Sequence, residues 1–268
     1  MSPARARPLS FIAALGYESM PTPRVAASLA DAGYDAVEWT MAHVDRILAP
    51  ASALACQQDL VSGGEAAVDR SLAAVEAAAA AGVPVVDVLT GPNLWEEGAV
   101  RGGDEVSWST ALRGLERICE RGEQLGVAIG FEPCWGTLAE DAEGAERVLA
   151  TVPVGVTFDP SHFVMSGDEI PALVRRWGAR IVNVHLKDAF GRRGLEGEDF
   201  HFCLLGEGMV PWAQFFATLD EVGYAGPMAV EFEAYRYYEQ VLGGDPGAAA
   251  RLAATQVEAL LAPGGAGA

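Results

Sequence analysis

Three carboxylates and one imidazole, each at the end of a hydrophobic run, are the residues of this sequence that point most directly to chemistry. Glu132 follows V-A-I-G-F, Asp159 follows V-G-V-T-F, His185 follows I-V-N-V and Glu231 follows M-A-V. If these runs are buried strands of one parallel sheet, their carboxyl ends meet at one edge. Oxygen ligands with one imidazole favour a hard divalent ion such as Mn²⁺, Mg²⁺ or Co²⁺, with Zn²⁺ a weaker alternative. The sequence therefore predicts a metal site.

Each of these acids also has a simpler interpretation as a structural residue. An acid at a strand end often caps the helix that follows it, or pairs with a nearby arginine. Four consecutive strands that all end on a metal-ligating side chain are harder to explain by capping alone. We therefore favour metal binding for the set over a structural role for its members.

The elements that must position these residues alternate along the chain. Short apolar runs are followed by longer amphipathic stretches, which is typical of repeated β-α units around a parallel sheet. Gln57, Gln58 and Asp59 interrupt the third of the eight apolar runs. Eight units predict an α/β protein with a (β/α)8 TIM barrel, whose active site lies at the carboxyl ends of the strands. The expected strands are Leu9–Leu15, Ala36–Trp39, Ala53–Val61, Val85–Leu89, Val127–Glu132, Gly155–Asp159, Ile181–His185 and Met228–Glu231.

The expected helices lie between these strands, and three of them are followed by glycine, which favours a helix end. No Pro/Gly/Ser linker divides the chain. We therefore predict a single barrel domain over 8–262, with flexible ends at 1–7 and 263–268. The expected helices are Pro23–Ala32, Glu65–Ala81, Val106–Leu125, Asp141–Ala150, Glu169–Trp177, Trp212–Val222 and Gly247–Leu261.

Composition narrows the class of partner. The 268 residues carry a formal net charge of -19, and half of them are hydrophobic. A broad nucleic-acid or anionic-membrane surface needs clustered Lys and Arg, so neither partner is expected, and a small-molecule substrate fits better. No secretory leader and no apolar run of about 18 residues is present, which predicts a cytoplasmic protein.

The four cysteines are expected to be free thiols. Cys56, Cys119, Cys134 and Cys203 are far apart, and none belongs to a C-x-x-C pair. A chain of this size with a large core does not need disulfides to stabilise it.

Several motifs occur in an order that is more specific than any one of them. They are F-E-P at 131–133, D-P-S-H at 159–162, H-L-K-D at 185–188, L-G-E-G at 205–208 and G-Y-A-G-P-M-A-V-E-F-E at 223–233. In this order and spacing the chain resembles the sugar phosphate isomerase/epimerase superfamily with the xylose-isomerase-like TIM barrel. That superfamily includes ketose 3-epimerases, hydroxypyruvate isomerases and inosose dehydratases. The resemblance covers nearly the whole chain and is most specific from Glu132 to Glu233.

The resemblance implies one divalent metal ion, held by Glu132, Asp159, His185 and Glu231. It also implies that Glu132 and Glu231 are an acid/base pair, which moves a proton next to a carbonyl through an enediolate. The expected enzyme is an isomerase or epimerase acting on a sugar or hydroxy-carbonyl compound. The alternatives are a lyase that dehydrates an inosose or 3-oxo-sugar, or cleaves an oxidised glycoside, and a barrel that binds sugar without turnover.

The resemblance also bears on partners. The chain has only four histidines, too few for the histidine-rich three-metal site of the DNA-repair endonucleases that share this barrel. Barrels of this kind often pair, so a homo-oligomer is an open expectation.

Five side chains near the strand ends are predicted to contact substrate, and for His162 and Arg192 this is what the resemblance implies. They are His162, Lys187, Arg192, Trp95 and Trp135. Lys187 is the only lysine of the chain. Each has an alternative role: His162 could orient a ligand, Lys187 could pair with a ligand carboxylate, and the tryptophans could pack in the core. Of the two adjacent arginines, we favour Arg192 over Arg193 as the substrate contact.

Other polar residues near the expected rim are weaker candidates. For Glu38, His43 and His201 a surface or supporting role is favoured over catalysis. Trp39 could line a sugar pocket or pack in the core. Cys134 stands where many relatives carry asparagine, so a polar substrate contact is expected to be lost or replaced.

Overall fold

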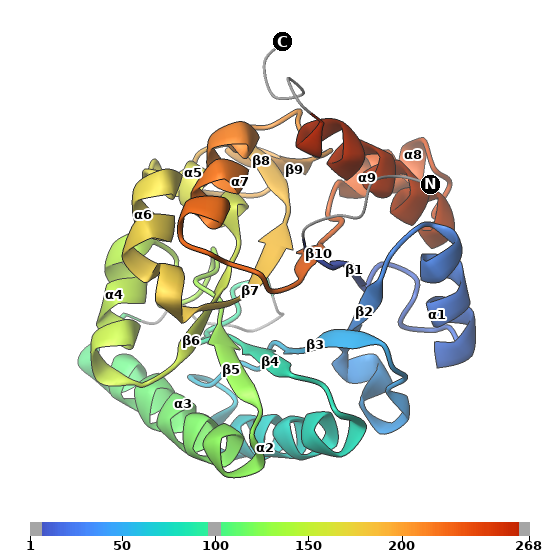
Figure 1. The fold of residues 1–268 in the computed structure, drawn as a ribbon. Helices are drawn as coiled ribbons and strands as arrows, with labels where there is room; N and C mark the ends of the chain where they lie inside the picture. The colour runs from blue at the N-terminus through green and yellow to red at the C-terminus, as the bar shows by residue number, and fades with distance from the viewer. Residues whose placement is uncertain (1–6, 96–102, 263–268) are drawn as a thin grey trace.

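Eight parallel strands close into a barrel. The computed structural model describes residues 7–95 and 103–262, and within them the strands hydrogen-bond in the closed order β1-β10-β7-β6-β5-β4-β3-β2 (Figure 1). The predicted TIM barrel is therefore confirmed. The barrel strands are β1 Leu9–Ile12, β2 Ala36–Thr40, β3 Ala51–Cys56, β4 Val85–Val88, β5 Ala128–Phe131, β6 Gly155–Phe158, β7 Ile181–Leu186 and β10 Met228–Val230.

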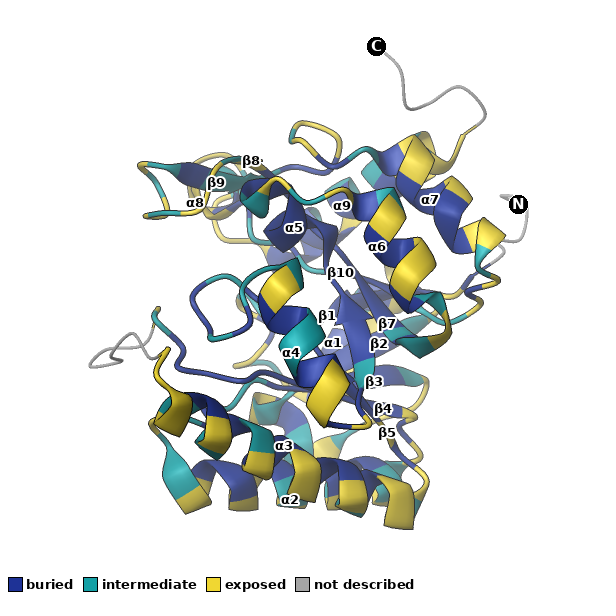
Figure 2. Ribbon diagram, turned by 90° about the vertical axis from the view of Figure 1, so that its left-hand side faces the viewer, coloured by how far each residue is buried: buried dark blue, intermediate teal, exposed yellow. Residues whose placement is uncertain are grey.

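Helices surround the barrel and turn their apolar faces toward it, as Figure 2 shows by the dark, buried residues on their inner sides. The longest, α3, begins at the N-cap Asp104, whose side chain accepts from the Ser107 backbone, and ends at Gly126 with a φ of 69°. The α-helices are α1 Thr22–Asp31, α2 Gly64–Ala81, α3 Glu105–Leu125, α4 Ala142–Thr151, α5 Pro160–Ser166, α6 Ile170–Trp177, α7 Trp212–Glu221, α8 Tyr235–Gln240 and α9 Pro246–Leu261. Two 3-10 helices, η1 Met41–Arg46 and η2 Gly178–Arg180, join strands to their neighbours.

Two predicted strands were too long by several residues at their carboxyl ends, and four others by a single residue. β1 ends at Ile12 because the chain turns at Leu15 and Gly16, which have φ values of 46° and 87°. β3 ends at Cys56, because the Asp59 carboxylate accepts the backbone N–H groups of Val61 and Ser62, both at 2.8 Å. This side-chain-stabilised turn replaces the ladder hydrogen bonds of a strand.

Three short elements at the carboxyl ends of the strands were not predicted. They are the helices α5 and α8 and an antiparallel hairpin of β8 Asp188–Gly191 and β9 Phe200–Cys203. None is long enough to show a clear hydrophobic period. They nevertheless form the walls of the site described below.

Asp188 fastens the hairpin to the L-G-E-G turn. Its carboxylate accepts backbone hydrogen bonds from Gly206, Gly208 and Val210, and one from the Trp212 indole at 2.9 Å. A Cβ at Gly208 would collide with this carboxylate, so the position requires glycine. The H-L-K-D and L-G-E-G motifs are thus two halves of one turn structure.

The remaining sequence predictions concern the chain ends, the membrane and the thiols. Of the predicted flexible ends, only Arg7 is described; it is buried, and its Nε donates to the Tyr224 carbonyl at 2.7 Å. Residues 1–6 and 263–268 lie outside the described part. Across 7–95 and 103–262, no helix is long and apolar enough to cross a membrane. All four cysteines are free.

Candidate metal centre at the carboxyl ends of the strands

Four strand ends bring their side chains to one point. Glu132 follows β5, Asp159 follows β6, His185 lies on β7 and Glu231 follows β10, and these strands are consecutive neighbours in the barrel. One ligand atom from each of the four lies within 4.8 Å of all the others. Two ligands of an ion with bonds of about 2.0–2.4 Å can be at most about 4.0–4.8 Å apart. The spacing and the oxygen-rich donor set therefore fit one divalent ion.

His185 lies between carboxylates on both sides of its ring. Nδ1 lies 3.1 Å from Glu132 Oε1 and 3.4 Å from Glu231 Oε2, whereas Nε2 lies 3.1 Å from Glu38 Oε1. Burial by itself would lower the pKa of His185, but the Glu38 and Glu132 carboxylates outweigh burial and hold it well above its ordinary value. The Nδ1 nitrogen is therefore the one that faces the four-residue centre.

A second group of polar side chains lies deeper in the barrel. Glu38 on β2, Asp87 on β4 and His185 form a cluster of three fully buried groups, and Asn183 donates to Glu38 at 3.1 Å. Burial, with the nearby Glu132 carboxylate, raises the pKa of Asp87 well above its ordinary range. Glu38 was expected only as a polar residue near the rim, and Asp87 and Asn183 were not predicted as site residues. A charged residue inside the apolar run V-V-D-V-L was the signal available for Asp87.

Lys187 places its ammonium group among the carboxylates. Its Nζ lies 2.7 Å from Glu231 Oε2, 3.0 Å from Asp159 Oδ2 and 3.1 Å from Glu233 Oε2. Burial would lower the pKa of Lys187, but these carboxylates raise it well above its ordinary value. In turn, burial would raise the pKa of Glu231, but Lys187 and His185 hold it well below its usual range. Lys187 therefore pairs with carboxylates of the candidate metal ligands, one of the two roles considered for it.

His162 presents a neutral imidazole to the same centre. Burial and the neighbouring Lys187 lower the pKa of His162 to about 3. Its Nδ1 accepts from the backbone N–H of Trp135 at 3.3 Å, so the proton of the neutral ring is on Nε2. Nε2 lies 3.4 Å from Asp159 Oδ2 and 3.8 Å from Glu132 Oε1. His162 therefore offers an N–H donor at the mouth of the centre, rather than a lone pair for an ion.

A cavity of about 180 Å³ opens above the four-residue centre. Trp95 and Trp135 line it with nearly parallel rings whose centroids are 6.2 Å apart. Five further lining residues, all on loops or short elements, were not predicted as site residues: Gln57, Glu196, Phe202, Glu233 and Tyr235. From the sequence, Gln57 was expected only to interrupt the third strand. In the structure it directly follows the end of β3, and its Nε2 lies 3.4 Å from Glu132 Oε2.

Arg192 is the predicted contact that does not reach this cavity. Its side chain is 83% exposed beyond the end of β8, and it pairs with Asp199 at 3.7 Å. Arg193, the less favoured alternative, pairs with Asp141 at 2.8 Å. The backbone N–H groups of Arg192 and Leu195 bond to Asp199 within the hairpin, and that of Arg193 bonds to the Met165 carbonyl on α5. Neither arginine side chain lines the cavity.

Of the weaker candidates, two are buried away from the cavity and one lines a neighbouring space. His43 is 3% exposed and lies 3.2 Å from the Tyr17 carbonyl, while Trp39 is fully buried and donates to the Leu48 carbonyl. His201 on β9 lines a second cavity beside the hairpin. Cys134 is buried and lines the cavity above the centre.

Comparison with known proteins finds a family for most of the chain. The profile described as the xylose isomerase-like TIM barrel matches residues 59–260. The rhizopine catabolism protein MocC of Rhizobium meliloti is 32% identical over 139 residues, which cover 47% of this chain and 43% of that protein. The inosose dehydratase of Geobacillus kaustophilus (strain HTA426) is 30% identical over 154 residues, or 52% of this chain and 49% of that protein. The chain thus spans about half the length of the curated relatives it matches.

Solved structures match over nearly the full length. The IolI protein with a bound zinc atom superposes with a TM-score of 0.75 at 20% identity, covering 95% of this chain and 98% of that one. An L-ribulose 3-epimerase superposes with a TM-score of 0.69 at 16% identity, covering 95% and 94%. These likenesses support the fold.

Proposed function

Because this chain belongs to the xylose isomerase-like TIM barrel family, we propose that it is a metal-dependent isomerase or epimerase acting on a sugar or a related hydroxy-carbonyl compound. The observation that carries the proposal is that Glu132 and Glu231 both reach His185 Nδ1, at 3.1 and 3.4 Å. Two carboxylates from different strands therefore flank one small space, which is the arrangement that proton removal and proton return require.

The residues that would hold the ion are Glu132, Asp159, His185 and Glu231. When bound, a divalent ion such as Mn²⁺, Mg²⁺, Co²⁺ or Zn²⁺ polarises a carbonyl and stabilises the negative charge that develops on it. The protein's own contribution is to hold three carboxylates close together in a buried space. Lys187 offsets part of their mutual repulsion.

The proton transfer falls to the two glutamates. One removes the proton from the carbon next to the carbonyl, and the other returns a proton to the same or the adjacent carbon. His162 would donate its Nε2 proton to a substrate oxygen, because its lowered pKa keeps the ring neutral at physiological pH. The flat faces of Trp95 and Trp135 would line the apolar side of a sugar ring.

A lyase is the second candidate, and the curated relatives favour it. Several of them are inosose dehydratases, among them the Geobacillus kaustophilus protein. The first step of such a dehydration is the same removal of a proton next to a carbonyl. The difference lies in whether a neighbouring hydroxyl group, or the linked group of an oxidised glycoside, leaves before a proton returns.

Deuterium exchange separates these reactions. The metal-loaded protein is incubated in D₂O with a panel of ketoses, inososes and 3-oxo-sugars, and the products are followed by NMR and ultraviolet absorption. An isomerase or epimerase gives deuterium at the carbon next to the carbonyl without a new chromophore, whereas a dehydratase gives an absorbing enone. If neither signal appears with Mn²⁺, Mg²⁺, Co²⁺ or Zn²⁺ on any member of the panel, the proposal is wrong.

A further inference from the structure

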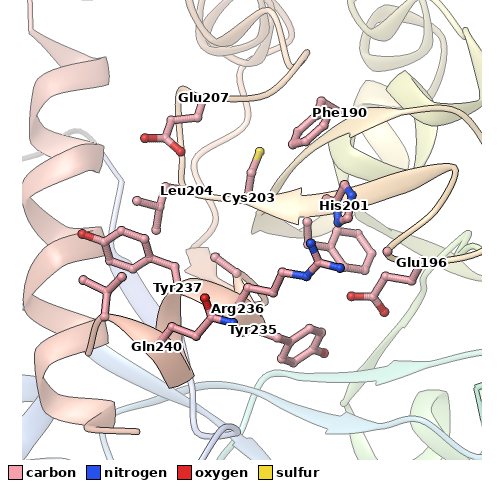
Figure 3. Close-up of a pocket in the computed structure, with 14 residues that line it drawn as sticks. Phe190, Glu196, His201, Cys203, Leu204, Glu207, Tyr235, Arg236, Tyr237 and Gln240 are labelled. Carbon is pink, nitrogen blue, oxygen red and sulfur yellow. The ribbon is translucent and has the colours of Figure 1, made fainter. Parts of the chain in front are cut away.

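A cavity of about 590 Å³ lies beside the metal centre, between the β8–β9 hairpin and α8. Phe190 and His201 line it from the hairpin, and Arg236 and Tyr237 line it from α8. Figure 3 shows the Arg236 guanidinium group reaching from α8 toward His201 and Glu196 on the opposite wall. The proposed chemistry at the strand ends uses none of these side chains.

This cavity shares a wall with the space above the metal centre. Glu196, Phe202 and Tyr235 line both of them. Lys187 Nζ lies 4.8 Å from the centroid of the Phe202 ring, and the Tyr235 hydroxyl donates to Glu233, itself a partner of Lys187. A molecule bound at the centre therefore needs to extend past a single layer of side chains to enter the larger cavity.

The two spaces differ in the size of the group that they can take. Sites for drug-sized ligands span about 300–1,000 Å³. The space above the centre, at about 180 Å³, is below that range and fits one small ring. The neighbouring cavity, at about 590 Å³, is within it. A free monosaccharide or cyclitol would leave the larger cavity without a ligand.

The lining of the larger cavity favours a neutral, planar group. Phe190 is 46% exposed and Tyr235 is 36% exposed, so both rings have faces open to a ligand. Arg236 makes no ion pair within the described ranges, although its charge acts on the Glu196 carboxylate across the cavity, and its guanidinium plane can stack on an aromatic ring. Glu196 and Glu207 also line the cavity, so one arginine does not give it the positive charge that a phosphate would need.

We infer that this cavity binds an aromatic group carried by the substrate, whose sugar or cyclitol ring lies at the metal centre. The inference rests on the proposed function and narrows its substrate class to aryl-substituted carbonyl sugars or cyclitols. The shared wall of Glu196, Phe202 and Tyr235 is the junction of the two parts of the site. Phe190 and Arg236 would be the residues that recognise the aromatic group.

Two probes that differ only in this group test the inference. They are phenyl 3-oxo-β-D-glucopyranoside and methyl 3-oxo-β-D-glucopyranoside, mixed with the full metal-loaded chain. Binding is followed by stopped-flow tryptophan fluorescence, to which Trp95 and Trp135 respond because both line the centre. The phenyl probe should bind about 10-fold more tightly than the methyl probe, since it buries one more ring.

Substitutions in the cavity test whether its residues cause the tighter binding of the phenyl probe. Phe190→Ala and Arg236→Ala should each remove most of the phenyl preference and leave methyl binding unchanged. Leu195→Ala, at an exposed apolar residue of the same hairpin, and Arg24→Ala, at an exposed arginine on α1, are the matched controls and should keep the preference. Equal binding of the two probes, or a phenyl preference that survives in the Phe190→Ala/Arg236→Ala double variant, overturns the inference.

Three further results would each overturn the inference, and each points to a different cause. A dimer that dissociates in the Phe190→Ala variant, measured by analytical ultracentrifugation, would show that a second copy of the chain covers the cavity. If the enzyme exchanges deuterium with free ketoses but binds neither probe, the aromatic subsite is wrong while the proposed function stands. Absence of exchange with every sugar would instead overturn the proposed function, and the inference with it.

Discussion

Lys187 Nζ lies 2.7 Å from Glu231 Oε2, so the only lysine of the chain neutralises one of the four candidate metal ligands. The same ammonium group lies 3.0 Å from Asp159 Oδ2. The Lys187 ammonium group is thus a positive charge that lies beside the four candidate ligands, where a bound metal ion would be a second one. Charge balance among Lys187, the carboxylates and the ion should therefore couple metal binding to stability.

Lys187→Met should destabilise the metal-free protein and increase its response to metal. Loss of the buried cation leaves Asp159, Glu231 and Glu233 facing one another, and breaking a buried ion pair in this way costs about 3–5 kcal/mol. Mn²⁺ should raise the Tm of the variant more than that of the wild type, because the ion replaces the lost charge. Urea unfolding and thermal melting with and without Mn²⁺ measure both effects.

The control for this prediction is Arg117→Met, which removes an exposed pair with Glu65. It should leave unfolding unchanged, because exposed ion pairs are screened by water. Unfolding of Lys187→Met at the wild-type urea concentration would contradict the role given to Lys187.

Glu38→Ala should weaken metal binding, although none of the four candidate ligands is itself substituted. Glu38 Oε1 lies 3.1 Å from His185 Nε2 and so orients the imidazole whose Nδ1 faces the centre. Losing such a partner should cost about 10–100-fold in metal affinity. Glu38→Gln keeps an oxygen acceptor and should lose less. Mn²⁺ competition with a fluorescent chelator measures the affinity, and the absorption of the Co²⁺ form reports a change in ligand geometry.

An unchanged affinity in Glu38→Ala, with a native circular dichroism spectrum, would contradict this prediction. Glu65→Ala is the comparison at an exposed glutamate, and it should bind Mn²⁺ as the wild type does.

Glu132→Gln and Glu231→Gln should each abolish deuterium exchange with a substrate. General acid/base catalysis contributes about 10²–10⁴-fold, and an amide cannot take up or return the proton. Metal content is measured on the same samples, so that loss of the ion is told apart from loss of the base. Glu116→Gln, at an exposed position of α3, should exchange normally. Undiminished exchange in either site variant would remove that glutamate from the acid/base pair.

The thiols should be inert at neutral pH. Burial raises the pKa of Cys56, Cys119 and Cys203 to about 12, and it raises the pKa of Cys134 as well. Only the thiolate reacts with iodoacetamide, so labelling of the native protein should be slow at pH 8 and should rise about tenfold per pH unit toward pH 12. Mass spectrometry gives the rate for each cysteine. Unfolding in urea should restore ordinary reactivity, and rapid labelling of the native protein at pH 8 would contradict the assigned burial.

Local pattern was enough to predict the barrel and the residues at its strand ends. A buried strand in a parallel barrel is a continuous apolar run, so Glu132, Asp159 and Glu231 stand out as the first charged residues after β5, β6 and β10. The elements that the hydrophobic pattern did not predict are short. The turn after β3 depends on one side chain, Asp59, and the hairpin strands have four residues each.

Tertiary structure alone decided how side chains meet across the barrel. Glu38 and His185 are 147 residues apart and lie on β2 and β7, which are not neighbours in the sheet, so only closure of the barrel brings them within 3.1 Å. The tertiary structure also decided that Lys187 points at the carboxylates and Arg192 points to solvent. The strand β8 lies between these two residues and leads the chain away from the centre. Sequence therefore determined which chemical groups reach the strand ends, since their order along each strand is local. Closure and loop packing determined their partners and the cavity beside them, since those contacts join residues far apart in the chain.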